Sequence, residues 1–309
     1  MAKVKTRRYH IYYWAKILFF ITGILPRRVS MALASFLGAV AFRVLPKYRD
    51  IAARNLEEAL GVSPSESAYI ARGVFRNLAR NGVDWIKCAR MSDGDIIALV
   101  SEAKGMENIE KVSSRGKGMI LLASHFGNWE LITSYLSLRG VDGSVIGRRL
   151  YFHKYDELIN SVRKRFGTGV IYRDESPKKI LKVLKSGRAL GILADQDVDT
   201  VDGVFVDFFG KAAYTPTAPV KLAMASGADI VPVFMIRKSD NTFRFVAESP
   251  ISAVQTGDRD EDVKRYTREW SAVLEKYVRE YPEQWVWIHR RWRTQEGHKT
   301  SNSETAHKL

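Results

Sequence analysis

Residues 119–130 read MILLASHFGNWE, an apolar run that stops at a small polar residue and a histidine. The five apolar residues predict a buried strand, because a short continuous apolar run suits a strand covered on both faces. A helical pattern opens near Asn128 and continues through Leu138. The stretch therefore predicts a strand, a turn and a helix, with His125 at the turn and Glu130 in the first helical turn. Open α/β sheets place their chemistry at such carboxyl ends of strands.

Further strand and helix patterns alternate around this stretch. The strand-like runs are Met119–Ala123, Ser144–Gly147, Gly169–Tyr172, Ala189–Ala194, Ile230–Ile236 and Phe243–Ala247. The helix-like segments are Asn128–Arg139, Lys154–Phe166, Ser176–Ser186, Thr217–Ser226 and Asp260–Arg279. This alternation predicts an α/β fold with a mixed, largely parallel sheet flanked by helices. Before it, residues 47–90 predict two amphipathic helices, the first ended by Gly61 and the second started by Ser63 and Pro64.

The first 46 residues are predicted to form a membrane-associated helical region. Residues 3–8 are basic, residues 9–25 are mostly apolar and aromatic, and Pro26 ends the run. As a helix, residues 9–25 would measure about 25 Å, slightly short of the roughly 30 Å hydrocarbon core, so both a spanning and an interfacial position stay open. The alternatives are a signal peptide, which lacks a clear cleavage motif here, and a buried core hairpin with residues 29–45.

Composition favours a globular protein with an anionic partner. The 309 residues are 46% hydrophobic and 27% charged, and 49 Lys and Arg against 34 Asp and Glu give a net charge of +15. Such an excess suits a membrane surface, nucleic acid, a phosphorylated substrate or an acidic carrier, although a merely basic soluble enzyme would share it. Residues 47–293 are predicted to form one catalytic domain, and the polar residues 294–309 a disordered tail.

The sequence offers little for a cofactor or a thiol nucleophile. Residues 116–118 lack the spacing of either glycine-rich nucleotide motif, no His-Glu-x-x-His motif occurs, and the six histidines are scattered, so neither a metal nor a cofactor is expected. Cys88 is the single cysteine and allows no intrachain disulfide, which suits a reducing compartment. Its helical surroundings favour a small core residue over a nucleophile.

His125 and Glu130 stand five positions apart, which on one continuous helix would point them in different directions. With His125 on the turn and Glu130 in the first helical turn, the two side chains can converge. Glu130 could then accept from one ring nitrogen and leave the other free to take a proton from a hydroxyl. No serine or cysteine elbow accompanies them, which favours direct attack by an acceptor hydroxyl. The alternative is a histidine that caps the helix, with Glu130 favoured there by the helix dipole.

These residues resemble the His-x(4)-Asp/Glu box of glycerolipid-type acyltransferases, and in particular the bacterial lipid A biosynthesis acyltransferases of the lauroyl and myristoyl group. Other segments agree along nearly the whole chain: Ala194–Asp197, Val206–Lys211, Ala213–Ala218, Gly227–Val233 and Trp287–Trp292. The resemblance implies transfer of a fatty acyl group from an acyl-carrier-protein or coenzyme A thioester to a hydroxyl of a lipid A precursor. It makes His125 the general base and Glu130 the residue that orients it. It also implies that the protein is located at the cytoplasmic face of the bacterial inner membrane.

The substrate-binding candidates are Asn128, Arg148, Arg149 and Asp195. Asn128 belongs to the box. The resemblance places an arginine after the next strand, where Arg148 matches best and Arg149 second. Asp195 follows a predicted strand, where its carboxylate could position substrate or a basic partner, or could cap a turn. Predicted partners are the acyl donor, an anionic glycolipid acceptor and the membrane, without nucleic acid.

A groove for the acyl chain is expected near residues 204–209, whose aromatic side chains could equally be ordinary core. Two further functions stay as alternatives. One is acylation of another membrane lipid, a phosphatidylinositol mannoside or a glycerophospholipid. The other is a non-catalytic basic module that binds membrane or nucleic acid, which the scattered placement of the basic residues disfavours.

Overall fold

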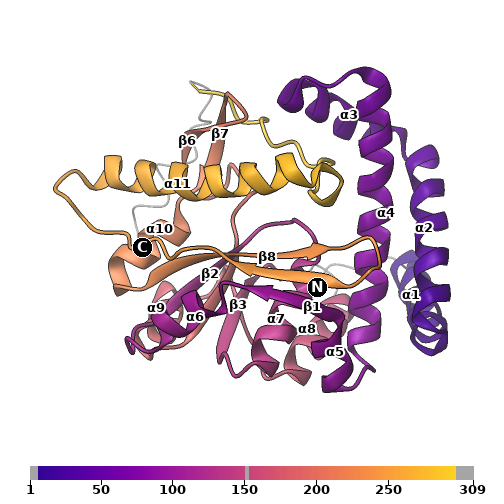
Figure 1. Cartoon of the computed structure of the whole chain (residues 1–309), viewed down its shortest axis with the longest axis horizontal. Helices are drawn as coiled ribbons and strands as arrows, with labels where there is room; N and C mark the ends of the chain where they lie inside the picture. Colours follow the sequence, from indigo (N-terminus) through magenta and orange to yellow (C-terminus); the bar gives the residue numbers. More distant parts are fainter. Residues whose placement is uncertain (1–5, 150–152, 297–309) are drawn as a thin grey trace.

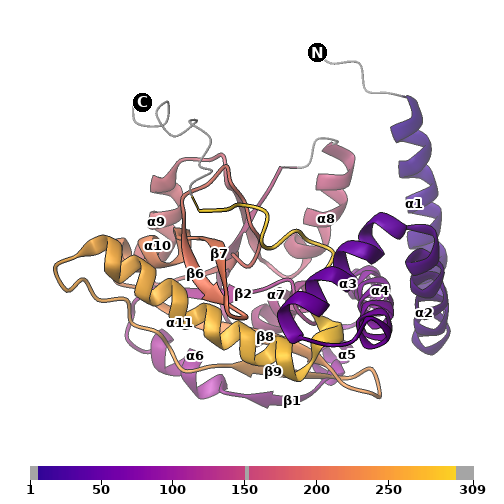
Figure 2. The same ribbon diagram turned by 90° about the horizontal axis from the view of Figure 1, so that it is seen from above.

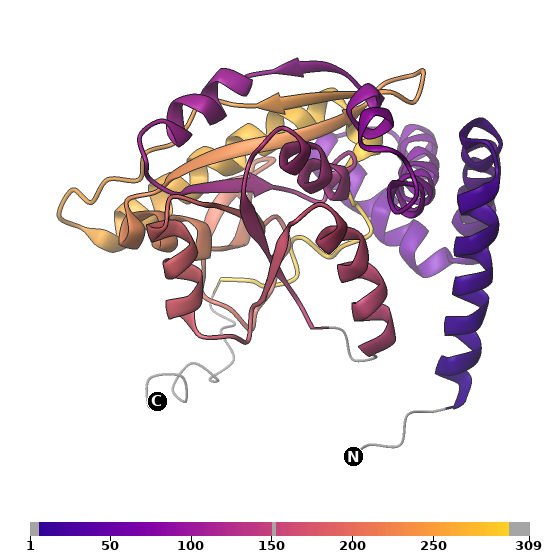
Figure 3. The ribbon, with the colours of Figure 1, turned by 90° about the horizontal axis from the view of Figure 1, so that it is seen from below.

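The computed structural model describes residues 6–149 and 153–296, and its N-terminal part is a group of helices beside an α/β body. These helices are α1 (Thr6–Ile24), α2 (Arg27–Val44), α3 (Pro46–Leu60) and α4 (Pro64–Cys88). In every view α1 and α2 stand on the outer side of α4 (Figures 1, 2 and 3). The predicted boundaries are confirmed, because Gly61 ends α3 in the left-handed conformation and the Ser63 hydroxyl caps α4.

Helix α2 packs closely on α4 because of a glycine. A Cβ atom on Gly38 would lie 2.7 Å from backbone atoms of Phe75 and Arg76, so a larger residue would push the two helices apart. Much of the outer face of this hairpin is nevertheless apolar and exposed. Its exposed side chains include Ile17, Phe20, Ile24, Val29, Phe36 and Val44.

The helices that the structure describes were compared with the length and hydropathy that a bilayer crossing needs. None of them meets both requirements alone. Helices α2 and α3 meet them only as a pair, with a bend of 91° where they join. Membrane association of the N-terminal region therefore stays a prediction.

The body is built on a seven-stranded sheet with the order β1-β9-β8-β2-β5-β3-β4. Neighbouring strands are parallel except at the β8–β9 pair, so β1 and β9 run against the other five, and the predicted mixed, largely parallel α/β fold is confirmed. The strands are β1 (Val100–Lys104), β2 (Met119–Ala123), β3 (Gly143–Gly147), β4 (Gly169–Tyr172), β5 (Ala189–Leu193), β8 (Asp229–Arg237) and β9 (Phe243–Ala247).

Helices cover both faces of the sheet (Figures 1 and 3). One face carries α9 (Pro177–Lys185), α10 (Ala218–Ser226) and α11 (Arg259–Glu280). The other carries α5 (Asp93–Leu99), α6 (Met106–Ser113), α7 (Trp129–Leu138) and α8 (His153–Arg165). Strand β2 serves both layers, because Ile120 and Leu122 face the first layer and Leu121 faces the second.

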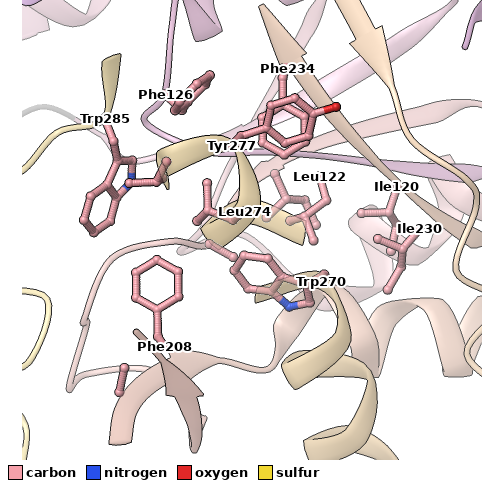
Figure 4. Packing of buried hydrophobic residues seen from close by; sticks show 14 of the residues in the cluster. Ile120, Leu122, Phe126, Phe208, Ile230, Phe234, Trp270, Leu274, Tyr277 and Trp285 are labelled. Atoms are coloured by element: carbon pink, nitrogen blue, oxygen red, sulfur yellow. The ribbon is translucent and has the colours of Figure 1, made fainter. Parts of the chain in front are cut away.

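The layer beneath α11 is rich in aromatic residues (Figure 4). Trp270, Leu274 and Tyr277 of α11 pack with Phe234 of β8 in one buried cluster, and the Phe234 and Tyr277 rings stack with their centroids 4.0 Å apart. Each such side chain contributes about 1.5–3 kcal/mol on burial. This helix therefore holds the central strands firmly on the face opposite α7.

A second sheet is the antiparallel hairpin of β6 (Gly203–Phe208) and β7 (Lys211–Pro216), which the sequence patterns did not predict. Phe208 and Phe209 are buried, and their rings contact Trp285 and Trp287 respectively. The expected acyl groove at residues 204–209 is therefore corrected for these two phenylalanines, which belong to the core. The C-terminal segment (residues 282–292) carries both tryptophans and begins with a short 3-10 helix, η1 (Pro282–Gln284).

Candidate active site

The box is a tight turn between β2 and α7, and its backbone is held from two sides. Gly127 has φ of 56°, and a Cβ atom there would lie 1.9 Å from the Met235 carbonyl oxygen, so the position needs glycine. The N–H of Gly127 donates to the carbonyl of Gln284, and the N–H of Asn128 donates to the carbonyl of Met235, both at 2.9 Å. Strand β8 and the C-terminal segment therefore fix the turn.

Asn128, a predicted substrate-binding residue, is buried and forms the N-cap of α7. Its Oδ1 accepts from the N–H of Leu131 at 3.3 Å, which satisfies one of the free donors at the helix start. Its Nδ2 is buried and has no hydrogen-bond partner within residues 6–149 and 153–296. The structure shows that Asn128 caps the helix. A contact between Asn128 and substrate stays a prediction.

The imidazole of His125 is paired with Asp195, from the loop after β5. His125 Nδ1 lies 2.8 Å from Asp195 Oδ1, and the His125 backbone N–H donates to Oδ2 of the same carboxylate at 2.9 Å. The indole N–H of Trp285 donates to Oδ2 as well, also at 2.9 Å. The two residues meet because β2 and β5 are parallel neighbours, so their carboxyl ends lie side by side.

The electrostatics of this pair favour an ionised aspartate. Burial by itself raises the pKa of Asp195, but the charge and hydrogen bonds of His125 and the hydrogen bond from Trp285 outweigh it and lower that pKa to about 2. A carboxylate can only accept, so Nδ1 of His125 carries the proton and Nε2 keeps its lone pair. The His125 side chain is 24% exposed, so Nε2 can reach an incoming group, whereas the Asp195 side chain is 1% exposed.

The pKa of His125 lies above its ordinary value of 6.5. Burial lowers this pKa, yet the charge of Asp195, its hydrogen bond to the ring and the charge of Glu130 together raise it. Glu130 is therefore close enough to act on the imidazole through its charge. The partner that hydrogen-bonds the ring, however, is Asp195.

Glu130 forms an ion pair with Arg163 of α8. Arg163 donates from Nη2 to Oε1 at 2.6 Å and from Nε to Oε2 at 3.2 Å, a two-point pair between partly buried side chains. The expected hydrogen bond from the His125 ring to Glu130 is not formed, because the ring donates to Asp195 instead and Glu130 pairs with Arg163. Arg163 escaped prediction because it lies in an ordinary basic run with Lys164 and Arg165.

Arg148 and Arg149 follow β3, at the same edge of the sheet as His125 and Asp195. Both are exposed. Arg149 lies 3.6 Å from the Asp174 carboxylate, and its guanidinium lies 3.9 Å from the ring centroid of Tyr172. The residues that follow them, 150–152, lie outside the described part of the chain. A role in binding substrate stays a prediction for both arginines.

A mainly apolar pocket lies between the sheet and α7. Glu130 and Arg163 line it near the catalytic turn, and Val141 and Ala189 line it at the opposite edge of the sheet. Its other walls are mainly apolar and include Leu121, Ile132, Leu136, Val145 and Leu193. Of the β5 residues that line it, Leu193 is 36% exposed at the edge of the sheet that carries the box, and Ala189 is buried at the opposite edge.

Other candidate groups do not take part in the site. Cys88 is buried, and burial followed by the charge of Asp84 raises the pKa of its thiol to about 12, so it is a core residue as predicted. His289 lies near Asp195, and burial lowers the pKa of its ring. The Nε2 atom of His289 accepts a hydrogen bond from the Asp197 N–H at 3.0 Å, so this nitrogen is unprotonated and already has a partner. Across residues 6–149 and 153–296, no three His, Cys, Asp or Glu side chains converge as a metal site.

The chain is similar in sequence to several known acyltransferases. The chain is 28% identical to the lipid A biosynthesis lauroyltransferase of Escherichia coli K12, over 95% of this chain and 96% of that protein. It is 25% identical to the lipid A biosynthesis palmitoleoyltransferase of the same strain, over 87% of each chain. A phosphatidylinositol mannoside acyltransferase of Mycobacterium tuberculosis CDC 1551 / Oshkosh is 27% identical over 58% of each chain.

The match to a family model extends across almost the whole sequence. The model of the bacterial lipid A biosynthesis acyltransferases covers residues 1–294, which include the box, Asp195, Arg163 and the C-terminal segment. The segments that carried the resemblance in the sequence all lie within this range. The resemblance is therefore confirmed, and the chain belongs to the bacterial lipid A biosynthesis acyltransferase family.

Proposed function

We propose that the protein transfers a fatty acyl group from a thioester donor to a hydroxyl of a lipid A precursor. The observation that carries this proposal is the His125–Asp195 pair at the edge of an apolar pocket. A carboxylate-oriented imidazole with a free Nε2 is a general base, and the pocket offers an apolar site for a hydrocarbon chain. Family membership supports the reaction class.

In this mechanism His125 Nε2 takes the proton of the acceptor hydroxyl as its oxygen attacks the thioester carbonyl. The tetrahedral intermediate then expels the donor sulfur as a thiolate, which recovers the proton from the imidazolium. Asp195 holds the ring through Nδ1 and stabilises the imidazolium, as the aspartate of a serine protease does. Glu130, kept in place by Arg163, adds a second negative charge near the ring.

The acyl chain of the donor lies in the pocket between α7 and the sheet. Strand β5 spans about 13 Å from Leu193 to Ala189 at roughly 3.3 Å per residue. The thioester then lies at the end lined by Glu130 and Arg163, beside the turn that carries His125, while the methyl end of the chain points toward Ala189. This placement of the chain replaces the one expected at residues 204–209.

A lipid A precursor is favoured as the acceptor over a phosphatidylinositol mannoside. The likeness to the E. coli lauroyltransferase covers 95% of the chain, whereas the likeness to the mannoside acyltransferase covers 58%. An acyl carrier protein is the proposed donor, with acyl coenzyme A as the alternative. A net charge of +15 favours both an acidic carrier and an anionic glycolipid.

The proposed location is the cytoplasmic face of the bacterial inner membrane. The exposed apolar side chains of α1 and α2 support insertion into the interface, and the basic residues nearby suit anionic headgroups. Flotation with vesicles tests this part. We expect the protein to float with anionic vesicles, and a Phe20→Ser, Phe36→Ser variant to remain at the bottom of the gradient while folding normally.

The reaction itself is tested by reconstitution. Purified protein in vesicles receives labelled acyl-carrier protein, acyl coenzyme A or neither, with a lipid A precursor or a phosphatidylinositol mannoside as acceptor, and products are identified by mass spectrometry. We expect acylation of the precursor by wild type and its loss in a folded His125→Ala variant. Equal activity of the two proteins would show that His125 is not the base, and activity on the mannoside alone would change the acceptor.

A further inference from the structure

The C-terminal segment (residues 282–292) binds both halves of the catalytic pair. Gln284 accepts from the Gly127 N–H at 2.9 Å, and Val286 donates to the His125 carbonyl at 3.1 Å. These two hydrogen bonds flank an antiparallel bridge between Phe126 and Trp285. The segment thus runs as a short extra strand along the turn that carries the base, and it places the side chain of Trp285 beside Asp195.

The carboxylate of Asp195 accepts three hydrogen bonds, one at Oδ1 and two at Oδ2. Oδ1 faces the ring of His125, and Oδ2 accepts from the His125 backbone and from the indole of Trp285, each at 2.9 Å. The indole therefore adds a third restraint, from outside His125, on the rotation of the carboxylate about its bond to Cβ. Without it, only the two groups of His125 itself would hold a fully buried anion.

An indole N–H is not satisfied everywhere in this protein. Within the described residues, Trp85, Trp270 and Trp292 each bury an indole nitrogen that finds no partner. Trp287 donates to the Pro282 carbonyl at 2.7 Å, inside its own segment. Trp285 instead reaches across the fold to the carboxylate that orients the base, and its side chain is buried between Phe208 and Trp287.

We propose that Trp285 is a positioning residue of the acyl-transfer reaction, which holds Asp195 in the rotation that orients His125. This inference rests on the function proposed above. It adds Trp285, but not Trp287, to the residues that support the active site. The residue acts through Asp195 and does not itself touch the reacting atoms.

Trp285→Phe tests the proposal, because it removes the N–H and keeps most of the ring. Trp287→Phe is the matched control, since it removes an equally buried indole of the same segment that makes no contact with Asp195. We expect kcat of Trp285→Phe to fall about tenfold, with KM for the donor nearly unchanged. Trp287→Phe should retain kcat even if its stability is lower.

A readout independent of turnover is the titration of His125, followed by ring-nitrogen NMR shifts. Loss of the indole donor leaves the Asp195 anion less stabilised, so it attracts the imidazole proton more strongly. We expect the pKa of His125 to rise in Trp285→Phe and to stay at the wild-type value in Trp287→Phe. An unchanged titration, or equal losses of kcat in the two variants, would overturn the proposal.

A double-mutant cycle separates positioning from general packing. In an Asp195→Asn background, Trp285→Phe should lower kcat less than about twofold further, because the group through which it acts is already altered. A full tenfold loss in that background would contradict the proposal. If wild type transfers no acyl group to any acceptor, the proposed function fails, while the titration of His125 still decides the role of Trp285.

Discussion

Nδ1 of His125 lies 2.8 Å from Oδ1 of Asp195, although the two residues are 70 positions apart in the sequence. Strand order explains the contact, because β2 and β5 are adjacent and parallel, with Ala123 opposite Leu193. The pair has the geometry of the histidine and the aspartate of a catalytic triad. That arrangement suits a reaction in which the substrate hydroxyl itself attacks.

Asp195→Asn should lower kcat about a hundredfold or more, because the amide cannot stabilise the imidazolium or hold the required tautomer. Asp197→Asn is the control, since Asp197 is also buried but accepts from Thr294 and does not contact His125. Steady-state kinetics of both variants check this. Similar losses in the two would mean that Asp195 serves the fold alone.

The acid limb of the pH profile of kcat/KM should lie above pH 6.5, since the pKa of His125 is raised above that ordinary value. The base acts only when it is neutral, so activity rises as the pH passes this pKa. Asp195→Asn should move the limb to lower pH. A limb that stays in place in this variant would contradict the assigned pairing.

The same pKa shifts predict how stability depends on pH. His125 contributes stability in full below about pH 6.5, and this contribution is lost as the pH rises through its raised folded pKa. Asp195 contributes stability above pH 3.8, which is lost as the pH falls toward its folded pKa of about 2. Urea midpoints measured across this range should change with pH less in His125→Ala than in wild type.

Glu130→Gln and Arg163→Met test the second carboxylate. Glu130→Gln should lower the pKa of His125 less than Asp195→Asn does, because it removes a nearby charge and no hydrogen bond to the ring. Arg163→Met leaves Glu130 without its ion-pair partner. Because both side chains line the pocket proposed for the acyl chain, KM for the donor should rise. If Glu130→Gln shifts the titration as far as Asp195→Asn, Glu130 is the orienter after all.

Ala189→Leu should shorten the preferred acyl chain. Ala189 is buried and lines the pocket at the edge of the sheet opposite the box, so a larger side chain there fills space proposed for the last methylene groups. A panel of acyl donors of increasing length checks this, and activity with the short donors is the internal control for folding. An unchanged chain preference would place the acyl chain elsewhere.

Asp84→Ala should destabilise the fold by about 3–5 kcal/mol, because it leaves a buried arginine unpaired. Asp84 is fully buried and pairs with Arg237 at 2.7 Å and with the more exposed Arg27 at 2.9 Å. Urea unfolding measures the loss. Arg27→Gln leaves the buried pair intact and should lower the free energy of unfolding much less. Equal losses in the two variants would show that the buried pair contributes no more to stability than the exposed one.

This network also links the N-terminal helices to the catalytic turn. Arg237 donates to Asn81 at 2.6 Å, and Asn81 donates to the Gly127 carbonyl at 2.5 Å. Arg27 at the start of α2 joins through Asp84. The helices proposed to contact the membrane are thus connected by hydrogen bonds to the backbone that carries the base.

Local patterns were enough for the strand–turn–helix at the box. The predicted strands Met119–Ala123, Gly169–Tyr172 and Phe243–Ala247 have the same bounds in the structure, because short runs rich in apolar residues and bounded by turn residues identify strands. Strand β1 was missed, since its sequence is polar and its side chains are partly exposed. The β6–β7 hairpin was missed as well, and its phenylalanines were considered for a groove.

The sequence by itself determined that His125 lies on the turn after a strand and that Glu130 lies in the first turn of a helix. Only the tertiary structure decided that Asp195 is the partner of the imidazole, that Arg163 pairs with Glu130 and that Trp285 reaches the same carboxylate. The physical reason is that hydrophobic periodicity reports which face of an element is buried. Hydrogen-bond partners depend instead on which strand ends the sheet places side by side.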